Sequence, residues 1–272
     1  MRIRRPAVAG QFYPAHPAQL LAAVQGMLAE SEAAAAPARA AIAPHAGYVY
    51  SGRTAARVFA RLEVPRRVVV LCPNHTGLGE SSHGGSACAV GVWQTPIGDV
   101  AVDEALAARL LALCPLLEDD PDAHRREHAV EVMLPFLLVR RPDVALTPVV
   151  LAWADWPSCR ALGEALATLV RESEEPVLLL ASSDMNHYES AEIGKRKDAL
   201  ALAEVVKLDG ESLLEVTRRN HVTMCGRAPA ASVLHAARLL GAASAEVVDY
   251  SHSGMVTGDD EAVVGYAGVV AR

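Results

Sequence analysis

Apolar residues in this chain follow two spacings that alternate from end to end, and the alternation predicts strands separated by helices. The strand-like runs are Ala40–Ala43, Arg67–Cys72, Ala87–Trp93, Asp99–Val102, Ala145–Leu151, Val177–Ala181, Ala245–Tyr250 and Ala262–Val270. The runs with helical spacing begin after Pro17 and at Ser51, or cover Asp103–Leu113, Glu127–Val139, Ser158–Val170, Ile193–Leu208, Glu211–Arg218 and Ala228–Leu240. This order predicts an α/β fold with a mainly parallel or mixed sheet and helices on both faces. Because no Pro- or Gly-rich linker marks a boundary, we expect residues 1–272 to form one domain.

Composition narrows the class of protein further. The 272 residues are 51% hydrophobic and carry a net charge of −7 without a basic patch, which argues for a packed globular protein and against a nucleic-acid partner. The apolar runs have strand length, far below the roughly 18 residues of a membrane span, and no apolar segment follows the charged first residues. Five widely spaced cysteines argue against a disulfide framework. We therefore expect a cytoplasmic protein with no membrane contact.

Polar side chains follow three of the predicted strands. His45 comes just after the first, His75 just after the second, and Asp184 and His187 just after Val177–Ala181. The carboxyl ends of parallel strands meet at one edge of a sheet, so these side chains could line one cleft. Imidazole is also the commonest ligand for transition metals. A single histidine in a loop would carry little weight, but three in the same topological position favour a functional site.

A fourth candidate is Cys225, which lies just before a predicted helix that begins near Arg227. A thiolate is stabilised near a helix N-terminus and is deprotonated outright by a metal ion. His221, Gly226 and Arg227 make its surroundings polar, whereas the other four cysteines are expected to be structural.

The segment Glu127-His-Ala-Val-Glu131 has two interpretations. On the predicted helix its two glutamates are one turn apart, and they form either a solvated face or a carboxylate–histidine group that supports a metal ligand. The H-E-x-x-H zinc motif, glycine-rich phosphate loops and the G-x-S-x-G elbow are all absent from the sequence.

Seven ordered motifs together carry a family resemblance. They are Arg5-Pro-Ala-Val-Ala-Gly-Gln-Phe-Tyr-Pro14, Pro44-His-Ala-Gly-Tyr48, Pro73-Asn-His75, Glu127-His-Ala-Val-Glu131, Ser182-Ser-Asp-Met-Asn-His187, Met224-Cys-Gly-Arg227, and Ser253-Gly with Thr257-Gly-Asp259 and Val264-Gly-Tyr-Ala-Gly268. The chain resembles the Memo-like family, which is called AmmeMemoRadiSam system protein B in prokaryotes. The resemblance implies a single α/β domain akin to class III extradiol dioxygenases, the non-haem iron enzymes that cleave catechol rings. In those enzymes two histidines and a glutamate bind iron, and another histidine acts as acid and base.

The resemblance also implies roles for individual residues. His45 and His75 match the family's two metal histidines, and Cys225 matches its third ligand. Asp184 and His187 match residues that line the same pocket, with His187 at the place of the acid/base. A thiolate in place of the dioxygenase glutamate makes the site softer, so iron(II) is favoured while copper and zinc remain open.

Two functions follow as expectations. The first is a metal-binding redox protein of unknown substrate, in which Asp184 orients His187 for proton transfer, with His128, Glu131, Tyr48 and Arg227 around the ligands. The second is an interaction protein that uses the same cleft to bind a peptide or a partner. The family name links such proteins with radical-SAM and AMMECR-type proteins, which we expect as partners beside a small-molecule or peptide ligand.

Overall fold

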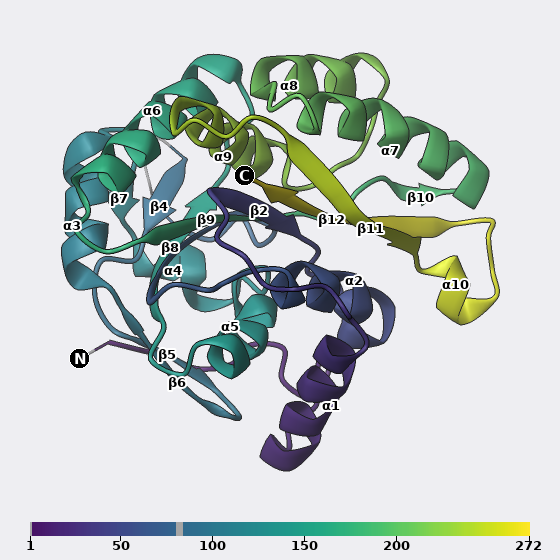
Figure 1. The fold of residues 1–272 in the computed structure, drawn as a ribbon, viewed down its shortest axis with the longest axis horizontal. Helices are drawn as coiled ribbons and strands as arrows, with labels where there is room; N and C mark the ends of the chain where they lie inside the picture. The colour runs from purple at the N-terminus through teal and green to yellow at the C-terminus, as the bar shows by residue number, and fades with distance from the viewer. Residues whose placement is uncertain (1, 80–83) are drawn as a thin grey trace.

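The computed structural model describes residues 2–79 and 84–272. Within these ranges, one mixed sheet of twelve strands runs through the molecule, and its main order is β1-β5-β6-β8-β3-β9-β2-β12-β10 (Figure 1). The strands are β1 (Ile3–Arg4), β2 (Ala40–Ala43), β3 (Arg67–Pro73), β4 (Gly85–Ala87), β5 (Val92–Thr95), β6 (Gly98–Val102), β7 (Glu118–Asp119), β8 (Ala145–Leu151), β9 (Val177–Ser182), β10 (His187–Glu189), β11 (Ala245–His252) and β12 (Val263–Ala271). The predicted α/β class is thereby confirmed.

The centre of the sheet is parallel, and the flank formed by β12 and its neighbours is antiparallel. Strands β8, β3, β9 and β2 are parallel neighbours, with Val69 of β3 opposite both Thr147 of β8 and Leu179 of β9. On the far side, β12 pairs antiparallel with β2, β10 and β11. The central strands are buried on both faces, which explains their nearly unbroken apolar sequences.

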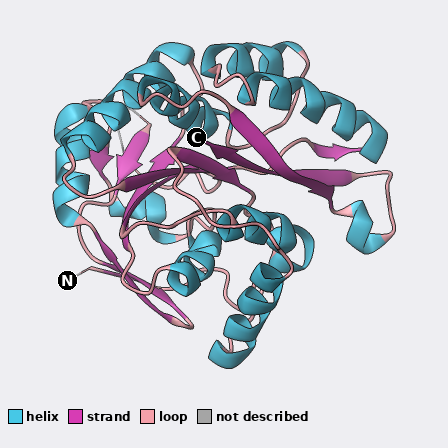
Figure 2. Ribbon diagram, viewed as in Figure 1, coloured by secondary structure: helices cyan, strands magenta, loops and turns pink. Residues whose placement is uncertain are grey.

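Helices cover both faces of this sheet (Figure 2). They are α1 (Pro17–Ala29), α2 (Tyr48–Ala60), α3 (Glu104–Leu113), α4 (Pro121–Arg125), α5 (Leu134–Arg140), α6 (Trp156–Glu172), α7 (Ala191–Val205), α8 (Gly210–Arg219), α9 (Arg227–Leu239) and α10 (Gly254–Thr257). Side chains of β3 alternate between the two resulting cores: Val69 and Leu71 pack on the α6–α9 side, and Val68 and Val70 on the α2–α5 side. Among the described residues, no helix is long and apolar enough to cross a bilayer.

Two predicted elements have bounds that the structure corrects. Helix α2 begins at Tyr48 with Gly47 as its N-cap, so Ser51 lies inside the helix and its hydroxyl donates to the Ala46 carbonyl instead of capping. The predicted strand Ala87–Trp93 divides into the end of β4, which pairs with β7 and β8, and the start of β5, which forms a hairpin with β6.

The predicted helix Glu127–Val139 was also wrong in its first half. Residues 127–130 form an irregular turn, a short 3₁₀ helix covers Glu131–Met133, and α5 begins only at Leu134. Pro135 lies in the first turn of α5, where its missing N–H is tolerated; deeper in a helix it would break a hydrogen bond. Glu127 and Glu131 therefore do not share a helix face.

Candidate metal centre

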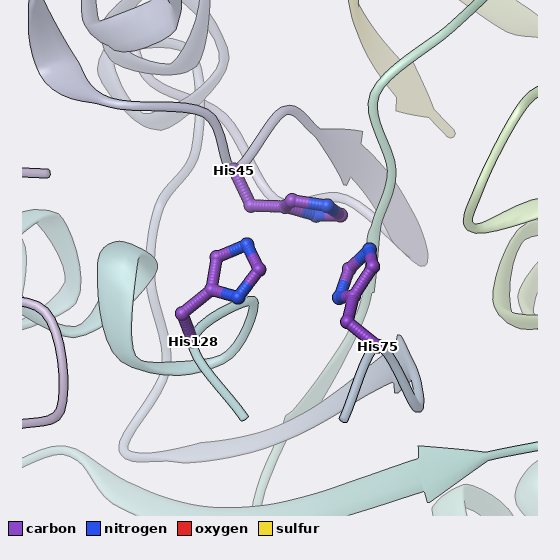
Figure 3. A group of neighbouring side chains, drawn as sticks. All are labelled: His45, His75 and His128. Carbon is purple, nitrogen blue, oxygen red and sulfur yellow. The ribbon is translucent and has the colours of Figure 1, made fainter. Parts of the chain in front are cut away.

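Three histidines converge at the edge where the central parallel strands end. His45 follows β2, His75 follows β3, and β9 lies between these two strands, while His128 comes from the turn before the 3₁₀ helix. Their ligating nitrogens all lie within 4.8 Å of one another. Figure 3 shows the three rings facing a common space, and their centroids are 4.7–5.4 Å apart. The sequence placed His45 and His75 together correctly, and the structure adds His128 to the same group.

The ring of His45 is oriented by Ser182, the last residue of β9. The Ser182 hydroxyl lies 2.7 Å from Nδ1 of His45 and donates to the Ala129 carbonyl at 2.8 Å. Since the hydroxyl has one proton, Nδ1 must be the donor in the first contact, and the lone pair on Nε2 stays available. Burial and the neighbouring imidazoles of His75 and His128 hold the pKa of His45 well below its usual range. A neutral ring with a free Nε2 is the form that binds metal ions.

The ring of His75 is oriented by Glu127. One carboxylate oxygen of Glu127 lies 2.9 Å from Nδ1 of His75, and the other accepts the His75 backbone N–H at 2.6 Å. Burial alone would raise the pKa of Glu127, but hydrogen bonds from His75 and from the Ala129 backbone outweigh it, so this pKa lies below its ordinary value. A carboxylate on the far nitrogen of a histidine is a common support for a metal ligand, since it fixes the tautomer.

His128 stacks on His75 and is more than half-buried. Its Nδ1 lies 3.4 Å from the same Glu127 carboxylate. Burial lowers the pKa of His128, although the Glu127 charge opposes this shift, so the ring is also neutral near pH 7. The expectation that His128 stands beside the predicted ligands is consistent with this geometry.

Cys225 lies next to His45. Its Sγ is 3.4 Å from Nε2 of His45 and accepts the backbone N–H of Asp184 at 3.3 Å. Two ligands of these types on one tetrahedral ion would be roughly 3.5 Å apart, from metal–sulfur and metal–nitrogen bonds of about 2.3 and 2.0 Å. Without an ion, burial raises the pKa of the Cys225 thiol. The position of Cys225 thus fits the ligand role that the resemblance implies.

Asp184 and His187 make contacts with different residues, and the expected contact between the Asp184 carboxylate and the His187 imidazole is not among those of the described residues. The Asp184 carboxylate accepts the backbone N–H of His45 at 2.8 Å, and its other oxygen is 3.9 Å from Nε2 of His45. Burial raises the pKa of Asp184 to about 6. His187 begins β10 and donates its backbone N–H to the Thr223 hydroxyl at 2.7 Å. Burial lowers the pKa of the His187 imidazole, and backbone hydrogen bonds at Met185 and Thr223 partly offset this.

Glu131 and Tyr48, which were expected around the ligands, fix the loop that carries His128. Glu131 is fully buried and accepts hydrogen bonds from Arg4, the Ala7 backbone and the Tyr13 hydroxyl. Tyr48 donates to the Val132 carbonyl at 2.7 Å. Both contacts tie the segment that carries His128 to the rest of the molecule.

A cavity of about 580 Å³ opens beside Cys225. Arg227, Arg218 and His221 supply its polar wall, and Trp153 supplies an apolar one. Arg227 was expected near the ligands, and the structure places it here, at the first turn of α9. The volume is typical of small-molecule sites.

Of the two residues that orient the histidines, Ser182 was not predicted from the sequence. It directly follows the predicted strand Val177–Ala181, and a hydroxyl at the edge where the histidines gather was a usable signal. Glu127 belongs to the segment for which a carboxylate–histidine group was one of the two interpretations, and its contacts with His75 agree with that interpretation, although the helix predicted around it is wrong.

Comparison with known proteins agrees with the motifs. Residues 4–270 match the family model described as Memo-like protein. The chain is 38% identical to a MEMO1 family protein of Methanopyrus kandleri over 99% of both chains. It is also 38% identical to a MEMO1 family protein of Aquifex aeolicus, again over 99% of both, and 36% identical to one of Methanocaldococcus jannaschii over 100% of this chain and 99% of the relative. This match extends over nearly every residue, the converging histidines and Cys225 included, and the chain therefore belongs to the Memo family.

Proposed function

We propose that this protein binds one transition metal ion and uses it in redox chemistry on a small ligand. The observation that carries the proposal is the convergence of His45, His75 and His128 with their nitrogens within 4.8 Å. Two of these rings are held by Ser182 and Glu127 so that Nε2 is left free. A pre-oriented imidazole group of this kind is the usual construction of a metal site.

The residues that would hold the ion are His45, His75 and Cys225, and His128 lies beside them. The separation of Cys225 Sγ and His45 Nε2 already suits two ligands of one ion, whereas the imidazole nitrogens are separated by up to 4.8 Å. Two histidines and one thiolate suit iron(II), and they also suit copper or zinc. The resemblance to class III extradiol dioxygenases favours iron.

The bound metal would supply electron transfer, and the protein would supply binding and proton movement. The cavity beside Cys225 would hold the ligand, with the Arg227 guanidinium available for a negatively charged group. His187 would accept and return a proton at its imidazole, because burial keeps that ring neutral at pH 7. Asp184 would hold the backbone of His45 in place.

The test begins with the metal content of protein purified without added metal. We expect close to one iron or copper ion per chain, and oxygen uptake once the metal is reduced. A His75→Ala variant should lose both. Protein that remains metal-free when supplied with iron(II), copper(I) and zinc would contradict the proposal.

A second candidate function is suggested by apolar side chains on the surface. Tyr188 is 79% exposed, and both Tyr188 and Tyr50 lie near the hydroxyl of Tyr266, where they add to the effect of burial in raising its pKa. Such exposed aromatic side chains favour a docking surface for a protein partner. Radical-SAM and AMMECR-type proteins are the proposed partners. If the metal-free His75→Ala variant binds such a partner as tightly as the unaltered protein, docking is independent of the metal.

A further inference from the structure

A cavity of about 850 Å³ lies at the N-terminal edge of the sheet, away from the metal ligands. Its walls are β1 with the following residues up to Val8, the segment from Cys88 to the start of β5, and α4 with Arg126. None of His45, His75, His128 and Cys225 lines it. The volume is in the range of small-molecule sites, so the cavity is large enough for a ligand of its own.

The wall of this cavity carries an excess of positive charge, although the protein as a whole is acidic. Five arginines and one aspartate, Asp122, line it, in a chain whose net charge is −7. Three of these arginines have carboxylate neighbours: Arg2 pairs with Asp119, Arg4 with Glu131, and Arg125 lies 3.7 Å from Asp122.

The remaining two arginines are available to a ligand. Arg5 and Arg126 are both exposed, and neither forms an ion pair with any residue in the two described ranges. They come from two separate segments of the cavity wall: Arg5 follows β1, and Arg126 follows α4. Guanidinium groups favour carboxylate and phosphate oxygens, so an anionic group is the complementary partner.

The rest of the wall is apolar. Ile3, Val8, Val90 and Val92 contribute aliphatic side chains, and Ile3 is 55% exposed. Trp93 lies under the Arg4 guanidinium, 4.5 Å from it, and its buried Nε1 has no hydrogen-bond partner within the described part of the chain. A buried N–H without a partner is costly and marks a donor that a ligand or water could satisfy.

We propose that this cavity binds a small organic anion with an aliphatic body. The anionic head would lie between Arg5 and Arg126, and the aliphatic body would cover Ile3, Val8 and Val90. A head without a body would leave the apolar wall in water, and a body without a head would leave the two guanidinium groups without a counter-charge. The site therefore requires both parts in one molecule.

Isothermal titration with four probes tests this chemistry. Octanoate and octyl phosphate carry both parts with different heads, octanol has only the body, and acetate has only the head. We expect octanoate and octyl phosphate to bind at one site per chain and octanol at least tenfold more weakly. Acetate should give no measurable heat. The stronger of the two anions identifies the head as carboxylate or phosphate.

Variants locate the site. Arg5→Gln with Arg126→Gln should weaken octanoate binding at least about fivefold, and Arg126→Glu should weaken it further, because removing a charge contact costs affinity and reversing it adds repulsion. Arg238→Gln, at an exposed arginine of α9 that does not line the cavity, is the matched control and should bind octanoate normally.

Two further variants separate this cavity from the metal centre. A carboxylate could ligate a metal ion, so His75→Ala must retain full octanoate binding. Arg227→Gln, on the wall of the other cavity, must retain it as well. The proposal is overturned if octanol binds as tightly as octanoate, if the Arg5 and Arg126 substitutions have no effect, or if His75→Ala or Arg227→Gln abolishes binding.

Discussion

The Ser182 hydroxyl can donate one hydrogen bond, and this limits which nitrogen of His45 can bind a metal ion. Because it donates to Ala129, it must accept from Nδ1 of His45, and the lone pair of the ring is then on Nε2. Glu127 has the same effect on His75 from the other side of the site. At the scale of residues, the site is therefore built as much by the groups that orient the rings as by the rings themselves.

Removing the Ser182 hydroxyl should leave the ring of His45 less firmly oriented. We expect Ser182→Ala to weaken metal binding about 10- to 100-fold, the usual effect of losing a hydrogen bond to a ligating histidine. Competition with a metal chelator measures the affinity. Ser232→Ala, at another buried serine whose hydroxyl bonds to its own helix, should leave the affinity unchanged. Equal affinity in Ser182→Ala and the unaltered protein would exclude the orienting role.

Cys225 and His128 can be distinguished as ligands by paired substitutions. We expect Cys225→Ser to reduce metal retention strongly while the fold persists, because hydroxyl is a poor ligand for soft metals and the volume change is small. His45→Ala and His75→Ala should have the same effect, whereas His128→Ala should retain most of the metal. Metal content per chain after dialysis measures this. Loss in His128→Ala with retention in Cys225→Ser would reverse the two assignments.

His187 should behave unlike any ligand. We expect His187→Ala to retain the metal and to lower turnover by about 10²–10⁴, the typical contribution of a general acid or base. The measurement pairs metal content with the rate of oxygen uptake after reduction. Metal loss as severe as in His45→Ala would instead make His187 a fourth ligand in a closed site.

At the scale of elements, the sequence predicted the strands well and the turns between them poorly. The central strands were found because they are buried on both faces, so their apolar runs are unbroken. His45 and His75 followed from this, since residues after parallel strands meet at one edge. The turn at residues 127–130 was not predictable in this way, because its shape depends on contacts distant in sequence, from Glu127 to His75 and from Glu131 to Arg4.

The turn before α9 shows how closely an element must pack to place a ligand. A Cβ at Gly226 would lie 2.2 Å from the Ser182 carbonyl oxygen and 2.5 Å from Cβ of Ser183. Since Ser182 is the last residue of β9 and Ser183 follows it directly, neither can move without displacing the strand end that orients His45. Glycine at this position therefore lets Cys225 approach His45.

Gly226→Ala should consequently harm both stability and the metal site. We expect a loss of about 1–3 kcal/mol in the free energy of unfolding, typical of overpacking, together with weaker metal retention. Gly26→Ala in α1 is the matched control, because nothing lies within 4 Å of its Cβ and alanine favours the helix. Chemical denaturation measures both variants. A Gly226→Ala protein with unaltered stability and metal content would show that β9 and the Cys225 turn can separate at no cost.

At the scale of the whole molecule, two buried groups outside the metal site respond to acid in opposite ways. His124 lies at the end of α4, and its Nε2 bonds to Ser86; burial lowers its pKa to about 4. Asp198, on α7, accepts hydrogen bonds from the Tyr250 hydroxyl and the Asn186 backbone, yet burial raises its pKa to about 6. Burial disfavours the protonated, charged form of His124 and the deprotonated, charged form of Asp198. As the pH falls, the contribution of His124 to the free energy of unfolding therefore decreases, and that of Asp198 increases.

Replacing His124 and Asp198 one at a time should reveal the contribution of each group to the pH dependence of the free energy of unfolding. The contribution of His124 is complete above its ordinary pKa of about 6.5 and is lost as the pH falls toward 4; that of Asp198 is complete below about 3.8 and is lost as the pH rises through about 6. Between pH 7 and pH 4, the free energy of unfolding of the unaltered protein should therefore fall by about 3 kcal/mol relative to that of His124→Gln, a variant that keeps a hydrogen-bond donor for Ser86. Over the same range it should rise by about 2 kcal/mol relative to that of Asp198→Asn.

Urea denaturation at a series of pH values measures both differences, each being the free energy of unfolding of the unaltered protein minus that of the variant. The two difference curves must slope in opposite directions, because burial acts on the charged form in each case and acid creates that charge on His124 but removes it from Asp198. Curves that slope the same way would mean that at least one of these groups is solvated well enough to titrate as it does in the unfolded chain.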